Sequence, residues 1–208
     1  MGSGYASYDV DLNEGGNYEL PVVIATEESL RGLATVVYDF DAEEVLQVQW
    51  PYTGTRSLDP DTGFGGVVSG LFSFNWVDGK LKATNESVGG RYTVCTSDDK
   101  WIYTQEANYH PDGGQVVCPV EPDLLIPFYV VLAPPGDDVT PENFIAFYCD
   151  GTFGIQILPN VWHQPVIPAS IGDSIHFNNK QGSIHGCVEV NTLKEFGKWL
   201  VIPKMRGV

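Results

Sequence analysis

Glycine and proline divide this chain into short strand-like runs, and their spacing constrains the fold more than any other feature. The 23 Gly and 14 Pro residues fall at intervals of roughly ten residues, between runs rich in Val, Ile, Tyr, Phe and Trp. Regular turn signals between such runs are typical of all-β sandwiches and barrels. The sequence therefore predicts an all-β chain, with strands at residues 35–40, 66–76, 92–94, 101–106, 115–118, 126–133, 144–148, 155–158, 174–178, 186–190 and 199–203.

Local turn signals predict a few elements more closely. Asp78-Gly79 follows an alternating apolar and polar run, which indicates a two-residue hairpin. Thr140 before Pro141 is typical of a helix start with Thr140 as the N-cap, and residues 192–196 are a second short helical candidate. Residues 51–66 are rich in Gly, Pro, Thr and Asp, and predict a long loop that folds over a barrel mouth.

Length and charge bound the domain organisation and the partners. We expect a single domain over residues 1–208, in which residues 1–90 add strands and the long loop to residues 91–208. Lys plus Arg number 11 and Asp plus Glu number 27, and the net charge of −16 opposes binding to nucleic acid or to an anionic membrane. Because the chain shows no long apolar run and opens without an export signal, we expect a cytoplasmic protein.

The four cysteines, Cys95, Cys118, Cys149 and Cys187, are widely separated in the sequence. They form no C-x-x-C pair, so the sequence indicates neither a zinc knuckle nor a dithiol redox site. We expect four free thiols, mostly packed in the interior.

Two histidine segments stand out within this β-rich sequence. One contains Asn108-Tyr109-His110-Pro111, and the other contains Asn160-Val161-Trp162-His163. A small β-barrel places strands side by side that are far apart in sequence. His110 and His163 are therefore predicted to point into one cavity at an active-site mouth.

The same residues match a metal-binding pattern in part. Metal-binding cupins present H-x-H-x4-E on one strand pair and a further His on a later strand, whereas this chain has Asn108, His110 and Gln115 at the first three places and His163 at the last. Two neutral amides replace ligands that first-row divalent ions prefer, which weakens binding. Glu106 lies one step from Asn108 on the same strand face and restores a carboxylate if it points inward. Both a metal-free and a metallated site remain open at this point.

About residues 106–190 resemble the ureidoglycolate lyase family. The matching pieces follow one another in the same order, and the combination of Gly-Asp-Asp with a later Asn-Val-Trp-His is fairly specific. These pieces are His110-Pro111 with Gly114-Gln115, Val130–Ala133 leading to Gly136-Asp137-Asp138, Ala146-Phe147 before Asp150-Gly151, Asn160–His163 followed by Pro165, and Lys180-x-Gly182.

The resemblance implies a cupin-like double-stranded β-barrel, or jelly roll, with additional N-terminal strands and few short helices. It implies a lyase of purine catabolism that splits the C–N bond of a small hydroxylated carboxylate, with ureidoglycolate giving glyoxylate and urea. A base takes the hydroxyl proton, a carbonyl forms and the nitrogen leaves protonated, so imidazoles suffice for both transfers. No cofactor is required, or only a weakly bound divalent metal, and family members assemble as homodimers.

On this resemblance, the expected catalytic residues, which are also the candidate metal ligands, are His110, His163 and Gln115. The expected substrate-binding residues are Lys180, Asn108, Glu106, Trp162 and Tyr109. Among these, Lys180 is expected to bind the substrate carboxylate as a point charge, whereas barrel core is the preferred role for Trp162 and Tyr109. His185 is expected behind the site, and His176 is expected to be structural.

Two other functions are compatible with this pattern. One is a metal-dependent cupin, such as an isomerase or a dioxygenase. The other is a non-catalytic cupin that binds a small molecule, in which the neutral Asn108 and Gln115 mark a lost active site.

Overall fold

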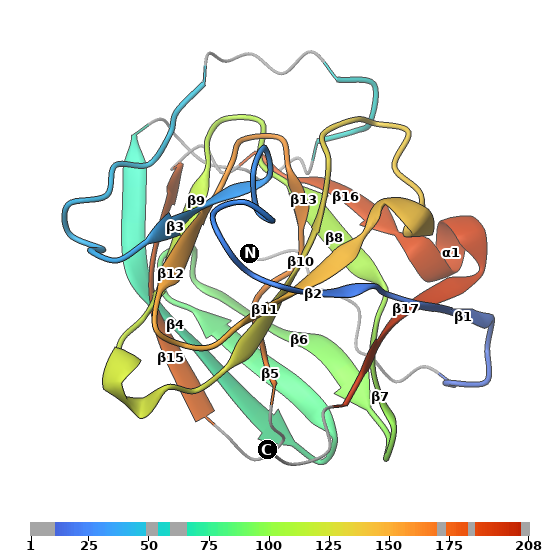
Figure 1. Ribbon diagram of the computed structural model, residues 1–208. Coiled ribbons are helices and arrows are strands. Elements are labelled where there is room, and N and C mark those ends of the chain that lie inside the picture. The colour runs from blue at the N-terminus through green and yellow to red at the C-terminus, as the bar shows by residue number, and fades with distance from the viewer. Residues whose placement is uncertain (1–10, 49–53, 59–65, 170–173, 183–185, 205–208) are drawn as a thin grey trace.

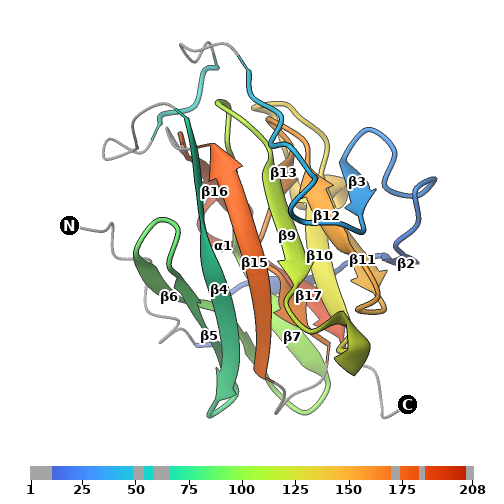
Figure 2. The same cartoon turned by 90° about the vertical axis from the view of Figure 1, so that its left-hand side faces the viewer.

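The protein is almost entirely β-structure, as the spacing of glycine and proline predicts. The computed structural model describes residues 11–48, 54–58, 66–169, 174–182 and 186–204. Its strands form two large sheets that curl around a shared interior (Figure 1), and the side view shows the long strands of one sheet running past those of the other (Figure 2). This architecture is the all-β, cupin-like fold expected from the sequence.

One sheet has ten strands, which come from the N-terminal, middle and C-terminal parts of the chain. Its longest antiparallel pair, β4 with β15, forms its central part. In spatial order the strands are β1 (Gly16–Glu19), β17 (Lys198–Pro203), β7 (Trp101–Thr104), β6 (Gly90–Ser97), β5 (Lys80–Asn85), β4 (Val67–Val77), β15 (Ser174–Gly182), β9 (Gln115–Pro119), β12 (Gly154–Ile157) and β3 (Ala34–Val37).

The other sheet has seven strands, and the described helices are short. Its order is β16 (Val188–Asn191), β8 (Glu106–Tyr109), β13 (Trp162–His163), β10 (Phe128–Ala133), β11 (Ile145–Cys149) and β2 (Val22–Ile24), with β14 (Ile167–Pro168) paired to β10. Two 3₁₀ turns and one α-helix accompany the sheets: Pro122–Leu124, Pro141–Asn143 and α1 (Thr192–Phe196).

The shared interior is lined by alternate residues of both sheets. Phe177 of β15 meets Phe128 of β10 with ring centroids 4.9 Å apart, so these two side chains mark the inward face of each sheet. Because side chains alternate along a strand, Asn179 and Gln181 share the inward face of β15 with Phe177. Leu132 shares the inward face of β10 with Phe128 by the same rule.

The first ninety residues contribute strands to both sheets. β1 pairs parallel to β17, β2 pairs parallel to β11, and β3 pairs antiparallel to β12. The predicted strand at residues 35–40 corresponds to β3, whereas the sequence reading missed β1 and β2. Of the predicted loop at residues 51–66, only Gly54–Leu58 and Gly66 lie within the described residues.

Four local predictions are confirmed. Asp78 and Gly79 have φ values of 50° and 73° and join β4 to β5, which is the positive-φ geometry that a two-residue hairpin requires. The Thr140–Pro141 signal starts the 3₁₀ turn with a capping box, and Thr192–Phe196 is α1. All four cysteines are buried thiols, and none of them forms a disulfide.

The predicted single strand at residues 101–106 is wrong, because the chain changes sheets inside it. β7 ends at Thr104 in the ten-stranded sheet, and β8 begins at Glu106 in the seven-stranded sheet. Between them, the carbonyl oxygen of Gln105 accepts hydrogen bonds from the backbone N–H and the side-chain hydroxyl of Thr192. These bonds replace the ladder bonds that a continuous strand would make at this residue.

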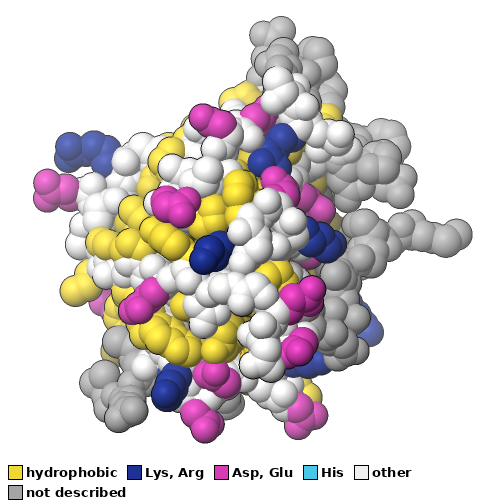
Figure 3. Space-filling model, turned by 90° about the vertical axis from the view of Figure 1, so that its right-hand side faces the viewer, with side chains coloured by type: hydrophobic (Ala, Val, Ile, Leu, Met, Phe, Trp, Pro, Cys, Tyr) yellow, Lys and Arg dark blue, Asp and Glu magenta, His cyan; other side chains and the backbone are white. Residues whose placement is uncertain are grey.

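Acidic side chains are spread over the face of the molecule that Figure 3 shows. Figure 3 shows one face of the molecule, where Asp and Glu side chains are scattered among apolar and uncharged groups with few cations. Such a distribution is typical of a solvated acidic surface. In the described part of the chain, no helix is long and apolar enough to cross a membrane.

Candidate active site

β8 and β13 place the two predicted histidines on the inward face of the seven-stranded sheet. His163 lies opposite Leu132 on one side and opposite Asn108 on the other. Leu132 faces the interior, and residues directly opposite each other in a sheet share a face. His110 follows the end of β8, two residues after Asn108, so the alternation of β8 directs it inward as well.

The structure brings the two imidazoles into contact. Their ring centroids are 4.9 Å apart and the ring planes meet at 65°. His110 is 5% exposed and His163 is 4% exposed, which leaves both rings almost entirely shielded from water. The structure therefore brings together two of the three residues that the sequence predicted as catalytic.

Backbone carbonyls determine which nitrogen of each ring carries the hydrogen. His110 Nδ1 lies 2.9 Å from the carbonyl oxygen of Gly186, and His163 Nδ1 lies 2.9 Å from that of Val161. A carbonyl oxygen only accepts hydrogen bonds, so each Nδ1 must be the donor. In the neutral rings, both Nε2 atoms then carry a lone pair that can accept a proton.

Burial keeps the pair neutral. It lowers the pKa of His163 to about 3, with the neighbouring His110 adding to the effect. Burial also lowers the pKa of His110, but the hydrogen bond to Gly186 and the negative charge of Asp112 act in the opposite direction. The negative charge of Asp112 favours the protonated form of His110 and is not among the causes that act on His163, which makes His110 the candidate proton acceptor.

Asp112 is a part of the site that the sequence reading missed. It is buried at 5% exposure, and its Oδ1 accepts a hydrogen bond of 2.9 Å from the backbone N–H of Gly186. The carbonyl of the same Gly186 accepts from His110. Asp112 thus holds in place the residue that orients the His110 ring, and it supplies negative charge nearby.

Gln115 belongs to a cluster of buried amides across the interior from β10. Its Nε2 donates to Asn179 Oδ1 at 2.8 Å and to Gln181 Oε1 at 3.2 Å. Asn179 Nδ2 in turn donates to Ser87 Oγ at 2.7 Å. Both amide hydrogens of Gln115 are used in this way, which leaves its Oε1 as the acceptor that can meet a ligand.

Lys180 is not placed with the histidines, which corrects the position expected from the sequence. It lies between the inward-facing residues Asn179 and Gln181 on β15, so it points to the outer face of the sheet. There its Nζ donates to the carbonyl oxygen of Phe40 and lies 4.5 Å from the centroid of that ring. Residues 37–45 cover this outer face with a small apolar cluster.

Trp162 and Tyr109 lie on the outer face of the seven-stranded sheet. There they belong to the hydrophobic core rather than to a substrate platform. Trp162 precedes the inward-facing His163, and its ring meets the Tyr109 ring at 4.6 Å and 88°. The Gly-Asp-Asp segment accepts a hydrogen bond from each of them. Trp162 Nε1 donates to Gly136 O and the Tyr109 hydroxyl donates to Asp137 Oδ1, each at 2.7 Å. The preferred core role of the two aromatic residues agrees with this packing.

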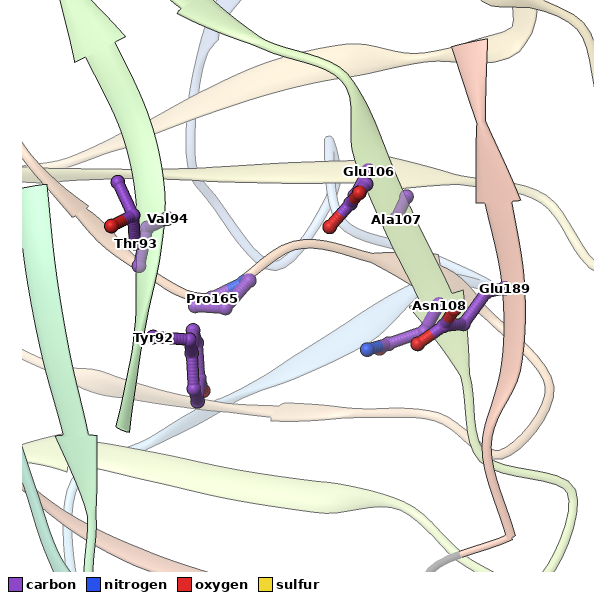
Figure 4. Close-up of a pocket in the computed structure, with 8 residues that line it drawn as sticks. All are labelled: Tyr92, Thr93, Val94, Glu106, Ala107, Asn108, Pro165 and Glu189. Atoms are coloured by element: carbon purple, nitrogen blue, oxygen red, sulfur yellow. The ribbon is translucent and has the colours of Figure 1, made fainter. Parts of the chain in front are cut away.

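Asn108 and Glu106 face a pocket next to the histidine pair (Figure 4). Burial raises the pKa of Glu106. A hydrogen bond of 3.1 Å from Asn191 Nδ2 to Glu106 Oε1 acts in the opposite direction and lowers it. The sequence reading did not single out Glu189, which lines the same pocket. Glu189 lies between the buried Val188 and Val190 on β16, and this alternation could have placed its side chain on the opposite face of the strand.

The other two histidines lie apart from this site or outside the described residues. His176 Nδ1 lies 3.0 Å from Ser73 Oγ on the outer face of β15 and β4, a placement that agrees with a structural role. His185 lies outside the described residues.

His110, His163 and Gln115 are the metal ligands that the sequence predicts. Among the described residues, no group of three or more His, Cys, Asp and Glu side chains is placed to hold a metal ion. The amide hydrogens of Gln115 are directed to Asn179 and Gln181, and its carbonyl oxygen is a weaker ligand than a carboxylate. The residues described here therefore do not fit a tight divalent-metal site.

Comparison with known proteins identifies the family. A family model described as Ureidoglycolate lyase matches residues 81–196, which is more than half of the 208 residues. The chain belongs to the ureidoglycolate lyase family. The match begins in β5, ends with α1 and includes both histidines.

Individual relatives match over a shorter stretch. Proteins named ureidoglycolate lyase from Azotobacter vinelandii, Stutzerimonas stutzeri and Pseudomonas aeruginosa (strain PAO1) are 34%, 36% and 36% identical to this chain over 80 residues. The aligned segment is 38% of this chain and 46%, 45% and 46% of the respective relatives. The chain therefore spans less than half the length of these ureidoglycolate lyases.

Proposed function

We propose that this protein cleaves ureidoglycolate to glyoxylate and urea. The observation that carries the proposal is the contact between two buried imidazoles whose Nε2 atoms both carry lone pairs. The family and the names of the relatives supply the substrate. Carbon–nitrogen elimination from a carbinol needs one group that takes a proton and returns it, and a neutral imidazole does both.

In the proposed reaction, the Nε2 atom of His110 accepts the proton of the substrate hydroxyl. The electron pair of the O–H bond forms the carbonyl of glyoxylate, and the C–N bond breaks. The protonated Nε2 then gives its hydrogen to the leaving nitrogen, which completes urea. His163 stays neutral because burial and its neighbour lower its pKa to about 3, so its Nε2 accepts a hydrogen bond from the substrate.

The products test this proposal directly. The purified chain is expected to release glyoxylate and urea in a 1:1 ratio from ureidoglycolate, without ammonia, because elimination leaves the carbamoyl group intact. Quantifying all three products distinguishes a lyase from an amidohydrolase, which releases ammonia. Absence of glyoxylate release contradicts the proposal and favours a non-catalytic binding protein.

We further propose that the reaction needs no tightly bound metal and that the protein acts as a homodimer in the cytoplasm, in purine catabolism. The incomplete ligand set described above supports the first point. Family resemblance supports the others. Light scattering of the purified chain tests the dimer, and turnover after dialysis against a chelator tests the metal.

The Asp112→Asn variant is expected to lower kcat on ureidoglycolate by roughly tenfold, with little change in KM. Asparagine keeps an oxygen that accepts from the N–H of Gly186 but removes the negative charge near His110. The weaker base then accepts the hydroxyl proton less readily. Steady-state kinetics check this, and a change confined to KM contradicts a role through His110.

The Lys180→Met variant is expected to leave kcat/KM within about twofold of the wild-type value. Its charge lies on the outer face, bonded to Phe40, rather than beside the imidazoles. The measurement is kcat/KM together with the thermal midpoint. A loss of 30-fold or more, roughly 2 kcal/mol of transition-state binding, in a protein of normal midpoint shows that Lys180 does reach the substrate.

A further inference from the structure

A pocket lies between β6 and the β8–β16 pair, beside the histidines but separate from their contact. Figure 4 shows β6 on one side and β8 with β16 on the other, with Glu106 and Asn108 directed toward the space between them. The lining residues are Tyr92, Thr93, Val94, Glu106, Ala107, Asn108, Pro165 and Glu189. Apolar walls with a few convergent polar groups are typical of a small-molecule site.

The polar groups of this pocket are mostly hydrogen-bond acceptors. Glu106 and Glu189 contribute carboxylates, and Asn108 contributes an amide that can donate and accept. No described residue hydrogen-bonds to the side-chain amide of Asn108. A ligand with several N–H groups and one carbonyl oxygen complements this set, whereas a carboxylate is repelled by it.

The register of the sheet connects the pocket to the imidazoles. Asn108 lies directly opposite Glu189 on one side and directly opposite His163 on the other. Neighbouring strands are about 4.7–4.9 Å apart. Asn108 therefore lies between His163 and the pocket residue Glu189 on the same face of the sheet.

The size of the pocket suits one planar group. Its volume is about 30 Å³, and a single water molecule needs roughly 10–15 Å³ on the same measure. The space therefore takes a group of at least about two or three non-hydrogen atoms. A terminal carbamoyl group has three: one carbon, one oxygen and one nitrogen.

We propose that this pocket binds the terminal carbamoyl group of a ureido substrate. Asn108 Nδ2 donates to the carbamoyl oxygen, and the carboxylates of Glu106 and Glu189 accept its N–H hydrogens. The inference rests on the proposed function and adds an orientation to it. The carboxylate of the substrate points away from the two glutamates, and the carbinol carbon lies at His110 and His163.

N-carbamoylglycine is the probe, because it has the carbamoyl group and the carboxylate but lacks the hydroxyl that the reaction needs. We expect it to bind the wild-type chain, and we expect Glu106→Gln to weaken binding by roughly 10- to 100-fold, as for loss of a hydrogen bond to a charged group. Glutamine keeps an oxygen for the bond from Asn191, so folding is preserved. Isothermal titration calorimetry gives the affinities, and the thermal midpoint reports the fold.

The control variant is Glu27→Gln, which removes the same charge from an exposed residue and is expected to leave the affinity unchanged. The proposal is overturned if N-carbamoylglycine does not bind the wild-type chain, or if Glu106→Gln binds it equally well. It is also overturned if guanidinoacetate binds more tightly than N-carbamoylglycine in a Glu106-dependent manner, because the pocket then selects cations. Glyoxylate release without N-carbamoylglycine binding rejects the pocket alone, and binding without release rejects the reaction alone.

Discussion

The His110→Ala variant is expected to lower kcat for glyoxylate release from ureidoglycolate by about 10²–10⁴-fold, the usual contribution of a general acid–base group. His110 is the proposed proton acceptor, because Asp112 and the Gly186 carbonyl favour its protonated form against the effect of burial. Without its Nε2, the site loses the imidazole nitrogen that accepts the hydroxyl proton in the proposed reaction. Stopped-flow or coupled assays of glyoxylate measure the loss.

His176→Ala is the matched control for this experiment. It removes an imidazole that hydrogen-bonds to Ser73 on the outer face of the ten-stranded sheet, and kcat is expected to stay within about twofold. The thermal midpoints of both variants separate loss of chemistry from loss of fold. Near-normal kcat in well-folded His110→Ala contradicts the assigned role and leaves His110 as a buried structural residue.

The free energy of unfolding is expected to fall by about 2–3 kcal/mol between pH 7 and pH 4.5 through His163 alone. The pKa of His163 is about 3 in the folded protein, against 6.5 for an unperturbed histidine. Between these values the unfolded chain binds a proton that the folded chain does not, so stability rises with pH over this window and is lost as pH falls through it. Urea unfolding at the two pH values measures the loss.

Comparison with His163→Asn isolates this contribution from the many carboxylates that also titrate in acid. Asparagine can donate to the carbonyl of Val161 but does not bind a proton in this range. The variant should lose about 2–3 kcal/mol less than the wild type over the same two pH values. An equal loss in both proteins shows that His163 titrates normally and is not held neutral by the site.

The sequence predicted the fold class and the histidine pair because both depend on local patterns that the structure preserves. Gly and Pro recur at the turns between strands, and Asp78-Gly79 adopts the positive φ values of a hairpin. His110 and His163 both belong to barrel strands or their ends, so closure of the barrel brings them together. What the sequence could not supply was the exchange of sheets at Gln105, because it depends on hydrogen bonds to the distant Thr192.

The placement of Lys180 failed for a different physical reason. A shift of one residue moves a side chain to the opposite face of a sheet, and the polar stretch Asn178–Gln181 carries no apolar residue to mark the phase. The alternation of Ile175 with Phe177 upstream does mark it, since both are buried. Extending that alternation assigns residues 179 and 181 to the interior and residue 180 to the outside.

Asp112 was missed because it acts through a residue far away in the sequence. Nothing in the sequence near Pro111 and Asp112 indicates that the backbone of Gly186 will lie between this carboxylate and His110. The hydrogen bonds that connect them span 74 and 76 residues. Such an arrangement follows only from the tertiary packing of the loop after β8 against the chain before β16.

The central claim is that His110 transfers the proton during elimination without a bound metal. The most direct measurement follows ¹³C-labelled ureidoglycolate by NMR with chelator-treated wild-type protein and with His110→Asn, alongside the affinity of each for N-carbamoylglycine. We expect equal amounts of glyoxylate and urea from the wild type, at least 100-fold slower conversion by the variant, and similar affinities. Rapid conversion by His110→Asn, or a chelator-treated wild type that is inert until a divalent ion is added, would contradict the account.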